Sequence, residues 1–333
     1  MLFRSQMGLA LVVDQDTQLP LAHQLYEGAR SDMKSFAEFL KPIRQRLRAL
    51  TGQPEQLTII FDAGASSKKN LADTENYVTA VPPSNHRALL EEAAAELAAV
   101  PLSTGAEARA WRARRTIAGK EREVVVIFSQ QLHEGQLRGL AQSVARSCLE
   151  MEEMGFNPRT SVDIAKRKLK KICGRQYLRA LLCHQVDADE QGATRYFGLR
   201  VLITDRTEWS TAQIVEAYRG QSKVEAAFRD LKDPRMLSTR PQFHWTDQKL
   251  HVHAFMCVTA YLLVTLLHRR ATRKAAYEGS SRRLLEELAE VRCCRLVDIT
   301  GRKGRPRVRF QIEEIDPAKQ ALAQALGAVP VFR

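Results

Sequence analysis

The sequence predicts an α/β fold, and three neighbouring segments lead to this class. Residues 57–61 are a continuous apolar run of strand length, and a run that is apolar on both faces is typical of a central strand in a sheet covered on each side. A second short strand is expected at residues 77–81, and residues 86–97 have the pattern of a helix. Strands that alternate with helices in this way indicate a sheet with helices packed on it.

The chain before this sheet is expected to form a β-hairpin and a helix. Residues 9–13 have strand character, residues 14–18 supply turn chemistry, and residues 19–25 return to an extended pattern. Apolar residues at helical spacing follow between residues 36 and 50. The first fifty residues are therefore expected to form a β-hairpin followed by a helix.

The pattern of predicted strands and helices changes between residues 105 and 205, and we interpret these residues as an insertion region. Two strands near residues 109–117 and 123–128 precede a long helix at about residues 134–154, and a basic helix and a strand at residues 196–204 follow. The pattern fits either an insertion into the main sheet or a separate small domain.

The predicted elements divide the chain into four regions. Residues 1–104 are the first part of the core and residues 105–205 the insertion region. Residues 206–272 hold two helices, expected at 211–235 and 248–270, and residues 273–333 are a basic C-terminal region.

The composition favours a polyanionic partner. The 51 Lys and Arg residues exceed the 38 Asp and Glu residues, which gives a net charge of +13 and points to nucleic acid, although a merely basic protein is the alternative. Six cysteines without a Cys-x-x-Cys pair exclude a disulfide framework or a zinc ribbon and suit a reducing cytoplasm. The apolar run Ala254–Leu267 is shorter than a membrane span needs, so we interpret it as a buried helix and expect no membrane contact.

Two carboxylates lie where a site could form. Asp62 follows the apolar strand at its carboxyl end, where side chains emerge into the crevice of an α/β sheet. Glu225 lies on the helix predicted over residues 211–235, where the spacing puts it on one face with Tyr218, Gln221 and Lys232. Paired carboxylates suit Mg²⁺, and a lysine suits a phosphate. The alternatives are a turn or helix cap for Asp62 and a solvated helix face for Glu225.

The helix from Tyr218 to Lys232 resembles the Tyr-x2-Arg-x3-Glu-x6-Lys signature of a group of bacterial insertion-sequence transposases of the DDE type. The match holds at Tyr218, Glu225 and Lys232. It departs at Gln221, where the signature has Arg, and Arg219 and Lys223 are nearby candidates to replace that phosphate contact. Residues 57–70 resemble the segment that carries the second Asp of this family, and residues 240–255 resemble the segment after the signature helix.

This resemblance implies an RNase H-like fold with a β-containing insertion before the Glu-bearing helix. It implies hydrolysis of DNA at transposon ends, followed by strand transfer, with Mg²⁺ (or Mn²⁺) held by Asp62 and Glu225. Lys232 would bind a phosphate near the scissile bond, and DNA contacts are expected from Tyr218, Arg219, Gln221, Lys223 and Arg229. The expected partners are transposon-end and target DNA and further copies of the chain, in the cytoplasm on the nucleoid.

The family's scheme uses three carboxylates, and the first Asp is not found here. Gly8–Gln24 already resembles the strands that follow it, so we expect an N-terminally truncated product that is impaired in cleavage. Asp14, Asp16 and Asp32 have explanations as turn residues or at a helix start. The alternatives are a catalytically inactive DNA-binding fragment that modulates the intact transposase, and a nuclease without strand transfer. The basic run at residues 166–171 is either a solvated helix face or a phosphate contact.

Overall fold

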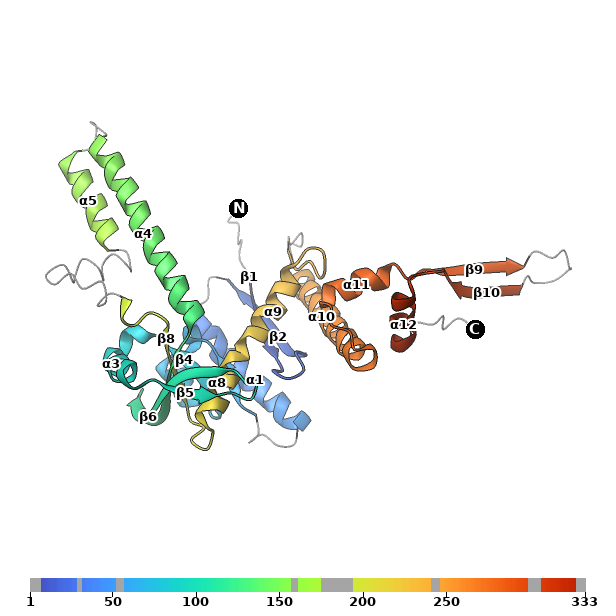
Figure 1. The fold of residues 1–333 in the computed structure, drawn as a ribbon, viewed down its shortest axis with the longest axis horizontal. Helices are drawn as coiled ribbons and strands as arrows, with labels where there is room; N and C mark the ends of the chain where they lie inside the picture. The colour runs from blue at the N-terminus through green and yellow to red at the C-terminus, as the bar shows by residue number, and fades with distance from the viewer. Residues whose placement is uncertain are drawn as a thin grey trace. The chain divides into compact units, whose positions relative to one another are not determined.

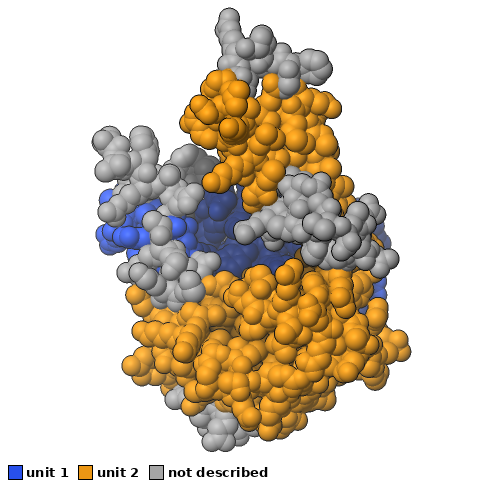
Figure 2. All heavy atoms as spheres, turned by 90° about the vertical axis from the view of Figure 1, so that its left-hand side faces the viewer, with its two compact units in different colours: residues 1–30, 220–333 blue, residues 31–219 orange. Residues whose placement is uncertain are grey.

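The computed structural model describes residues 7–28, 32–51, 57–156, 161–174, 194–240, 246–298 and 307–327. The chain divides into two compact units, coloured separately in Figure 2. Residues 31–219 form one, which we call the sheet unit. Residues 1–30 and 220–333 form the other, which we call the helical unit.

The sheet unit is built on six strands in the order β3-β4-β8-β7-β6-β5. In that order the strands are Ile59–Phe61, Tyr77–Val81, Leu199–Thr204, Lys120–Phe128, Glu107–Ile117 and Ala98–Pro101. β3 and β4 are parallel, and every other neighbouring pair is antiparallel. The strands of the predicted insertion region thus join the main sheet.

Both faces of this sheet are covered by helices. Successive strand residues point to opposite sides, so neighbouring residues of one strand pack in different cores. Val124 and Val126 of β7 pack in one apolar cluster with α2 (Lys68–Asp73), α3 (Arg87–Glu96) and Phe36 of α1 (Asp32–Thr51). Val125 packs in a second cluster with α8 (Thr211–Arg219). The predicted α/β class is confirmed, and a mixed sheet flanked by helices is consistent with an RNase H-like fold.

The position of β3 corrects one expectation. The sequence predicted a central strand, but β3 lies at the edge of the six-stranded sheet. Its apolar run has a different cause, since Ile59 packs in the first cluster and Ile60 in the second. Two covered faces make a strand apolar throughout, whether or not it has a partner on both edges.

Two helices are described in the connection between β7 and β8. The helix α4 (Gln130–Phe156) follows β7, and α5 (Val162–Cys173) packs beside it (Figure 1). His133 contacts the carbonyl oxygen of Phe197 through Nδ1 at 3.2 Å, and Gln136 Oε1 accepts a hydrogen bond from Gly198 N at 2.7 Å. The first turns of α4 are therefore fixed to the segment that enters β8.

The helical unit begins with the predicted hairpin, β1 (Met7–Val13) and β2 (Pro20–Glu27). The turn is closed by Asp14, whose carboxylate accepts hydrogen bonds from the amide and hydroxyl of Thr17. Leu9, Leu11 and Val13 pack against α9 (Gln221–Lys232) and α10 (Asp247–Ala275). The turn role of Asp14 is thus confirmed, whereas the side chain of Asp32 lies outside the described residues.

The C-terminal part of the helical unit has a small core of its own. Ala271 of α10, Leu284 of α11 (Ser281–Ala289) and Leu322 of α12 (Pro317–Leu326) are buried together. The hairpin of β9 (Cys293–Asp298) and β10 (Arg307–Ile312) connects α11 to α12.

The single helix predicted over residues 211–235 is two helices, α8 and α9, with a break at Gly220. Glycine is a weak helix former, and a side chain at this position would meet that of Gln15 at 2.3 Å. Tyr218 therefore ends one helix and Glu225 lies on the next.

The apolar run at residues 254–267 lies in α10, and only one side of this helix is buried. Ala254, Val258 and Tyr261 face the core, whereas Phe255, Met256, Leu263 and Leu266 are exposed. Among the described helices, α10 alone has the length and apolar composition of a membrane span, a criterion that core helices of soluble proteins also meet.

Candidate active site and DNA-binding residues

Asp62 lies directly after β3, as the sequence predicted, and its side chain is exposed. Its Oδ1 accepts a hydrogen bond from Ala63 N at 2.7 Å and so caps the short helix Ala63–Ala65. The cap interpretation of Asp62 is therefore correct, but it engages one oxygen of the carboxylate. The other oxygen points to no described partner and is available to a ligand.

The loop that carries Asp62 is held by its own polar groups. Buried Asn70 donates from its side-chain amide to the carbonyl oxygen of Ala65 at 2.8 Å. Ser66 Oγ donates to the carbonyl oxygen of Ala63 at 2.7 Å, and Ser67 caps α2. These bonds fix the backbone that follows Asp62, so the loop holds its carboxylate in a defined position.

Glu225 lies on an anchored helix with its side chain in solvent. Ala227 and Leu231, on the opposite side of α9, are 0% and 1% exposed in the core shared with β1 and α10. Arg229 follows Glu225 by one helical turn and Lys232 by two, and both are exposed. The structure thus brings Glu225, Arg229 and Lys232 together on one exposed helix face.

Lys232 lies at the last turn of α9, where its Nζ is 5.5 Å from the centre of the Phe228 ring. This contact holds the stem along the helix and leaves the ammonium group at the surface. Gln221 and Lys223, in the first turn of α9, are half-buried.

Tyr218 and Arg219 belong to α8, in the sheet unit, and only Arg219 is exposed. Tyr218 is 4% exposed, and its hydroxyl accepts a hydrogen bond from Arg200 Nη1 at 2.8 Å. The guanidinium carbon of Arg200 also lies 5.4 Å from the centre of the Tyr218 ring. The DNA contact expected of Tyr218 stays a prediction. Sequence analysis missed Arg200, because an arginine in a strand carries no signal of its distant partner.

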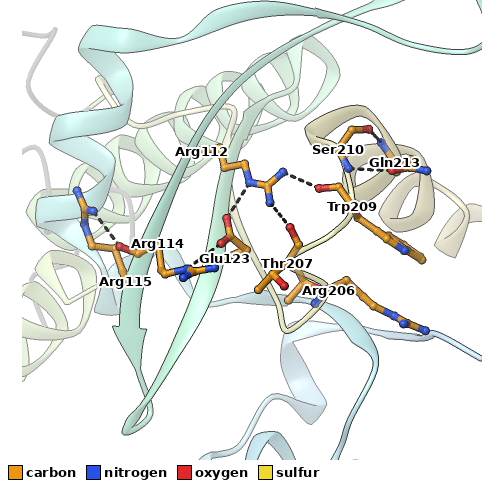
Figure 3. Close-up of polar contacts among 10 residues, drawn as sticks. Arg112, Arg114, Arg115, Glu123, Arg206, Thr207, Trp209, Ser210 and Gln213 are labelled. Atoms are coloured by element: carbon orange, nitrogen blue, oxygen red, sulfur yellow. Dashed lines mark hydrogen bonds and ion pairs between the residues drawn. The ribbon is translucent and has the colours of Figure 1, made fainter. Parts of the chain in front are cut away.

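A cluster of arginines fixes the segment that enters α8 (Figure 3). Arg112 donates to the carboxylate of Glu123 at 2.8 Å and to the carbonyl oxygens of Trp209 and Thr207 at 2.6 and 3.2 Å. Arg114 donates to the second oxygen of Glu123 at 3.1 Å. These bonds tie residues 207–209 to the β6–β7 hairpin and so position the start of α8.

The cluster also sets the charge state of Glu123, which is nearly buried. Burial raises the pKa of this carboxyl, but hydrogen bonds from Arg112 and Arg114, with the positive charges of both, outweigh burial and hold the pKa below its ordinary value. Glu123 is therefore an ionised structural group at neutral pH.

The described residues contain no group of three or more His, Cys, Asp or Glu side chains that could hold a metal ion. Asp62 lies in the sheet unit and Glu225 in the helical unit. Each is an exposed carboxylate, and carboxylate oxygens are the ligands that Mg²⁺ prefers. The chemistry of both residues therefore fits a hard divalent cation.

The class of fold is a six-stranded mixed sheet flanked by helices, which is consistent with an RNase H-like fold. Residues 3–263 match the family model described as the transposase DDE domain. The chain belongs to this family of DDE transposases, since the match covers most of its length. No curated protein matches the chain.

Proposed function

We propose that this protein carries out metal-dependent hydrolysis and strand transfer of DNA at the ends of an insertion sequence, with impaired activity, and that Asp62 and Glu225 are ligands of Mg²⁺ (or Mn²⁺). The observation that carries this proposal is the exposed face of α9. Glu225, Arg229 and Lys232 stand in solvent there, while Ala227 and Leu231 hold the helix in its core. A carboxylate beside two cations matches the needs of a metal ion and a DNA phosphate.

The residues have distinct roles in this proposal. When bound, the metal would polarise the phosphodiester and activate the attacking oxygen. Asp62 and Glu225 hold it through carboxylate oxygens, and Lys232 binds a phosphate oxygen beside the scissile bond. The DNA backbone is contacted by four further side chains, those of Arg219, Gln221, Lys223 and Arg229. Tyr218, at the end of α8, makes another contact with the backbone. The cap that Ala63 N makes with Oδ1 leaves the other oxygen of Asp62 for the metal.

Metal binding tests the two carboxylates without relying on catalysis. Binding of Mn²⁺, measured by electron paramagnetic resonance, should weaken at least about tenfold in Asp62→Asn and in Glu225→Gln, because each change removes one anionic ligand. The matched controls are Asp73→Asn and Glu278→Gln, which remove exposed carboxylates of the same two units. Equal binding by all four variants and the native chain would contradict the proposed ligands.

Cleavage tests the reaction itself. Duplex DNA with the insertion-sequence end should be nicked only with Mg²⁺ or Mn²⁺, and Asp62→Asn or Glu225→Gln should lower the rate at least about 100-fold. Lys232→Ala should lower it about tenfold or more, since it removes one cation from the transition state. A pre-cleaved end supplied with target DNA then separates strand transfer from hydrolysis alone.

A second candidate function is DNA binding without cleavage, by a chain that modulates an active transposase. It is favoured by the sequence, in which two carboxylates, Asp62 and Glu225, are assigned where the resemblance implies three. Such a protein would bind DNA with a steep salt dependence yet leave it intact at every metal concentration.

The proposal also includes the partners. DNA binding is supported by the family and by the net charge of +13. We place the protein in the cytoplasm, on the nucleoid, and expect several copies to assemble on the paired transposon ends.

A further inference from the structure

The helix α5 carries an unusual concentration of positive charge. Its 12 residues include Lys166, Arg167, Lys168, Lys170 and Lys171, against the single acidic residue Asp163. All five basic side chains are exposed. None of these residues is among the side chains assigned to the proposed active site.

The packing of α5 gathers these charges on one side. Ile172 is 4% exposed and Ala165 is half-buried, and they mark the packed side of the helix. Helical geometry puts Lys166, Arg167, Lys170 and Lys171 away from that side, in two rows with one turn of about 5.4 Å between successive charges. The helix α5 packs beside α4 (Figure 1), and all four of these side chains are exposed to solvent.

No carboxylate among the described residues forms an ion pair with this basic side. Its one hydrogen bond to a described residue is long, 3.4 Å, from Arg167 Nε to the carbonyl oxygen of Asp163. Some other cations of the chain do have carboxylate partners, as Arg282 has in Glu286 and Arg283 in Glu287.

Unpaired like charges at this spacing oppose helix formation. Lys166 with Lys170, and Arg167 with Lys171, are like-charge neighbours one turn apart. The helix dipole favours Lys170 and Lys171 in the last turn, but it gives no reason for Lys166 and Arg167. A row of phosphates would neutralise all four.

We propose that the basic side of α5 is a second DNA-binding surface, which holds the phosphates of duplex DNA without reading its sequence. DNA is favoured over an acidic protein because the family acts on DNA, so this inference rests on the proposed function. Gln136 of α4 accepts a hydrogen bond from Gly198 N, which anchors the base of α4 to the segment that enters β8. The surface on α5 is therefore carried by an anchored helix pair. Lysine and arginine on one helix face contact the backbone and release counterions.

The test is the salt dependence of binding to a labelled duplex of arbitrary sequence, about three helical turns long. Affinity is measured between about 50 and 200 mM NaCl for the full chain. The main variant is K166Q/R167Q/K170Q/K171Q, since glutamine forms helices well. A charge-conserving variant, K166R/R167K/K170R/K171R, keeps the surface. A matched control, R282Q/R283Q/K319Q, removes three cations that already have carboxylate partners.

We expect the slope of log affinity against log salt to fall by about 3 to 4 in the glutamine variant, at about 0.9 per lost phosphate contact. The other two variants should keep the native slope, and circular dichroism should report the native helix content for all. An unchanged slope in the glutamine variant, with normal DNA binding by the native chain, overturns this inference alone. Selective loss of poly-glutamate binding instead of DNA binding overturns it in favour of an acidic partner. A native chain that binds no DNA overturns the proposed function as well.

Discussion

Glu123 is a carboxylate that the fold keeps ionised. Its two oxygens accept hydrogen bonds from Arg112 and Arg114, and Arg112 also bonds the segment before α8. No local sequence pattern indicates this group, because its partners are set by the pairing of β6 with β7. By contrast, Asp62 and Glu225 could be chosen as candidates from sequence, since each is placed by its own strand or helix.

The lowered pKa of Glu123 predicts how stability depends on pH. Because the pKa is lower in the folded than in the unfolded chain, the carboxylate stabilises the fold above the unfolded value, and this contribution is lost as the pH falls through the folded value. Glu123→Gln should therefore lower the free energy of unfolding by about 1–3 kcal/mol at pH 7. The difference from the native chain should shrink below about pH 4. Urea unfolding from pH 3 to 7 measures it, and a difference that grows toward acid pH would contradict the role of the ionised form.

At the scale of elements, periodicity predicts strands and helices well but not their neighbours. The strands at residues 77–81, 107–117 and 120–128 were expected within a few residues, because each alternates or is apolar throughout. The edge position of β3 was not expected, because the sequence of a strand indicates which of its faces are covered but not which of its edges are paired. The break at Gly220 was also missed, because an isolated glycine inside a helical pattern is often tolerated.

The apolar core beneath α9 is expected to hold the candidate site in place. Leu231 is 1% exposed and packs with residues of β1 and α10. Leu231→Ala should lower the free energy of unfolding of the helical unit by about 3 kcal/mol, from lost burial and the cavity left behind. Leu231→Met, which nearly conserves volume, should cost less than about 1.5 kcal/mol. Urea unfolding followed by circular dichroism measures both, and equal losses in the two variants would argue against a close-packed site around Leu231.

At the scale of the whole molecule, the chain groups its elements in a way that no local pattern reveals. The hairpin at residues 7–27 belongs with α9 and α10, more than 190 residues later, because Leu9, Leu11 and Val13 share their core. The sheet unit has its own core on each face of the six strands. Contacts so distant in sequence depend on the assembled fold. Regions drawn from the pattern of predicted elements along the chain therefore need not coincide with the two units.

Separate cores predict separate unfolding transitions, and one substitution in each unit tests this. Arg122 is 3% exposed in the sheet unit, and its guanidinium donates to the Tyr77 hydroxyl at 2.5 Å and to the carbonyl oxygen of Leu71 at 3.2 Å. Arg122→Met should leave these buried acceptors without a donor and cost about 3 kcal/mol. In calorimetry the native chain should show two transitions. Arg122→Met should lower the midpoint of one and Leu231→Ala that of the other, because each acts on its own core. If either variant shifted both transitions by the same amount, the two units would unfold as one cooperative body, and Asp62 and Glu225 would then be carried by a single folding unit.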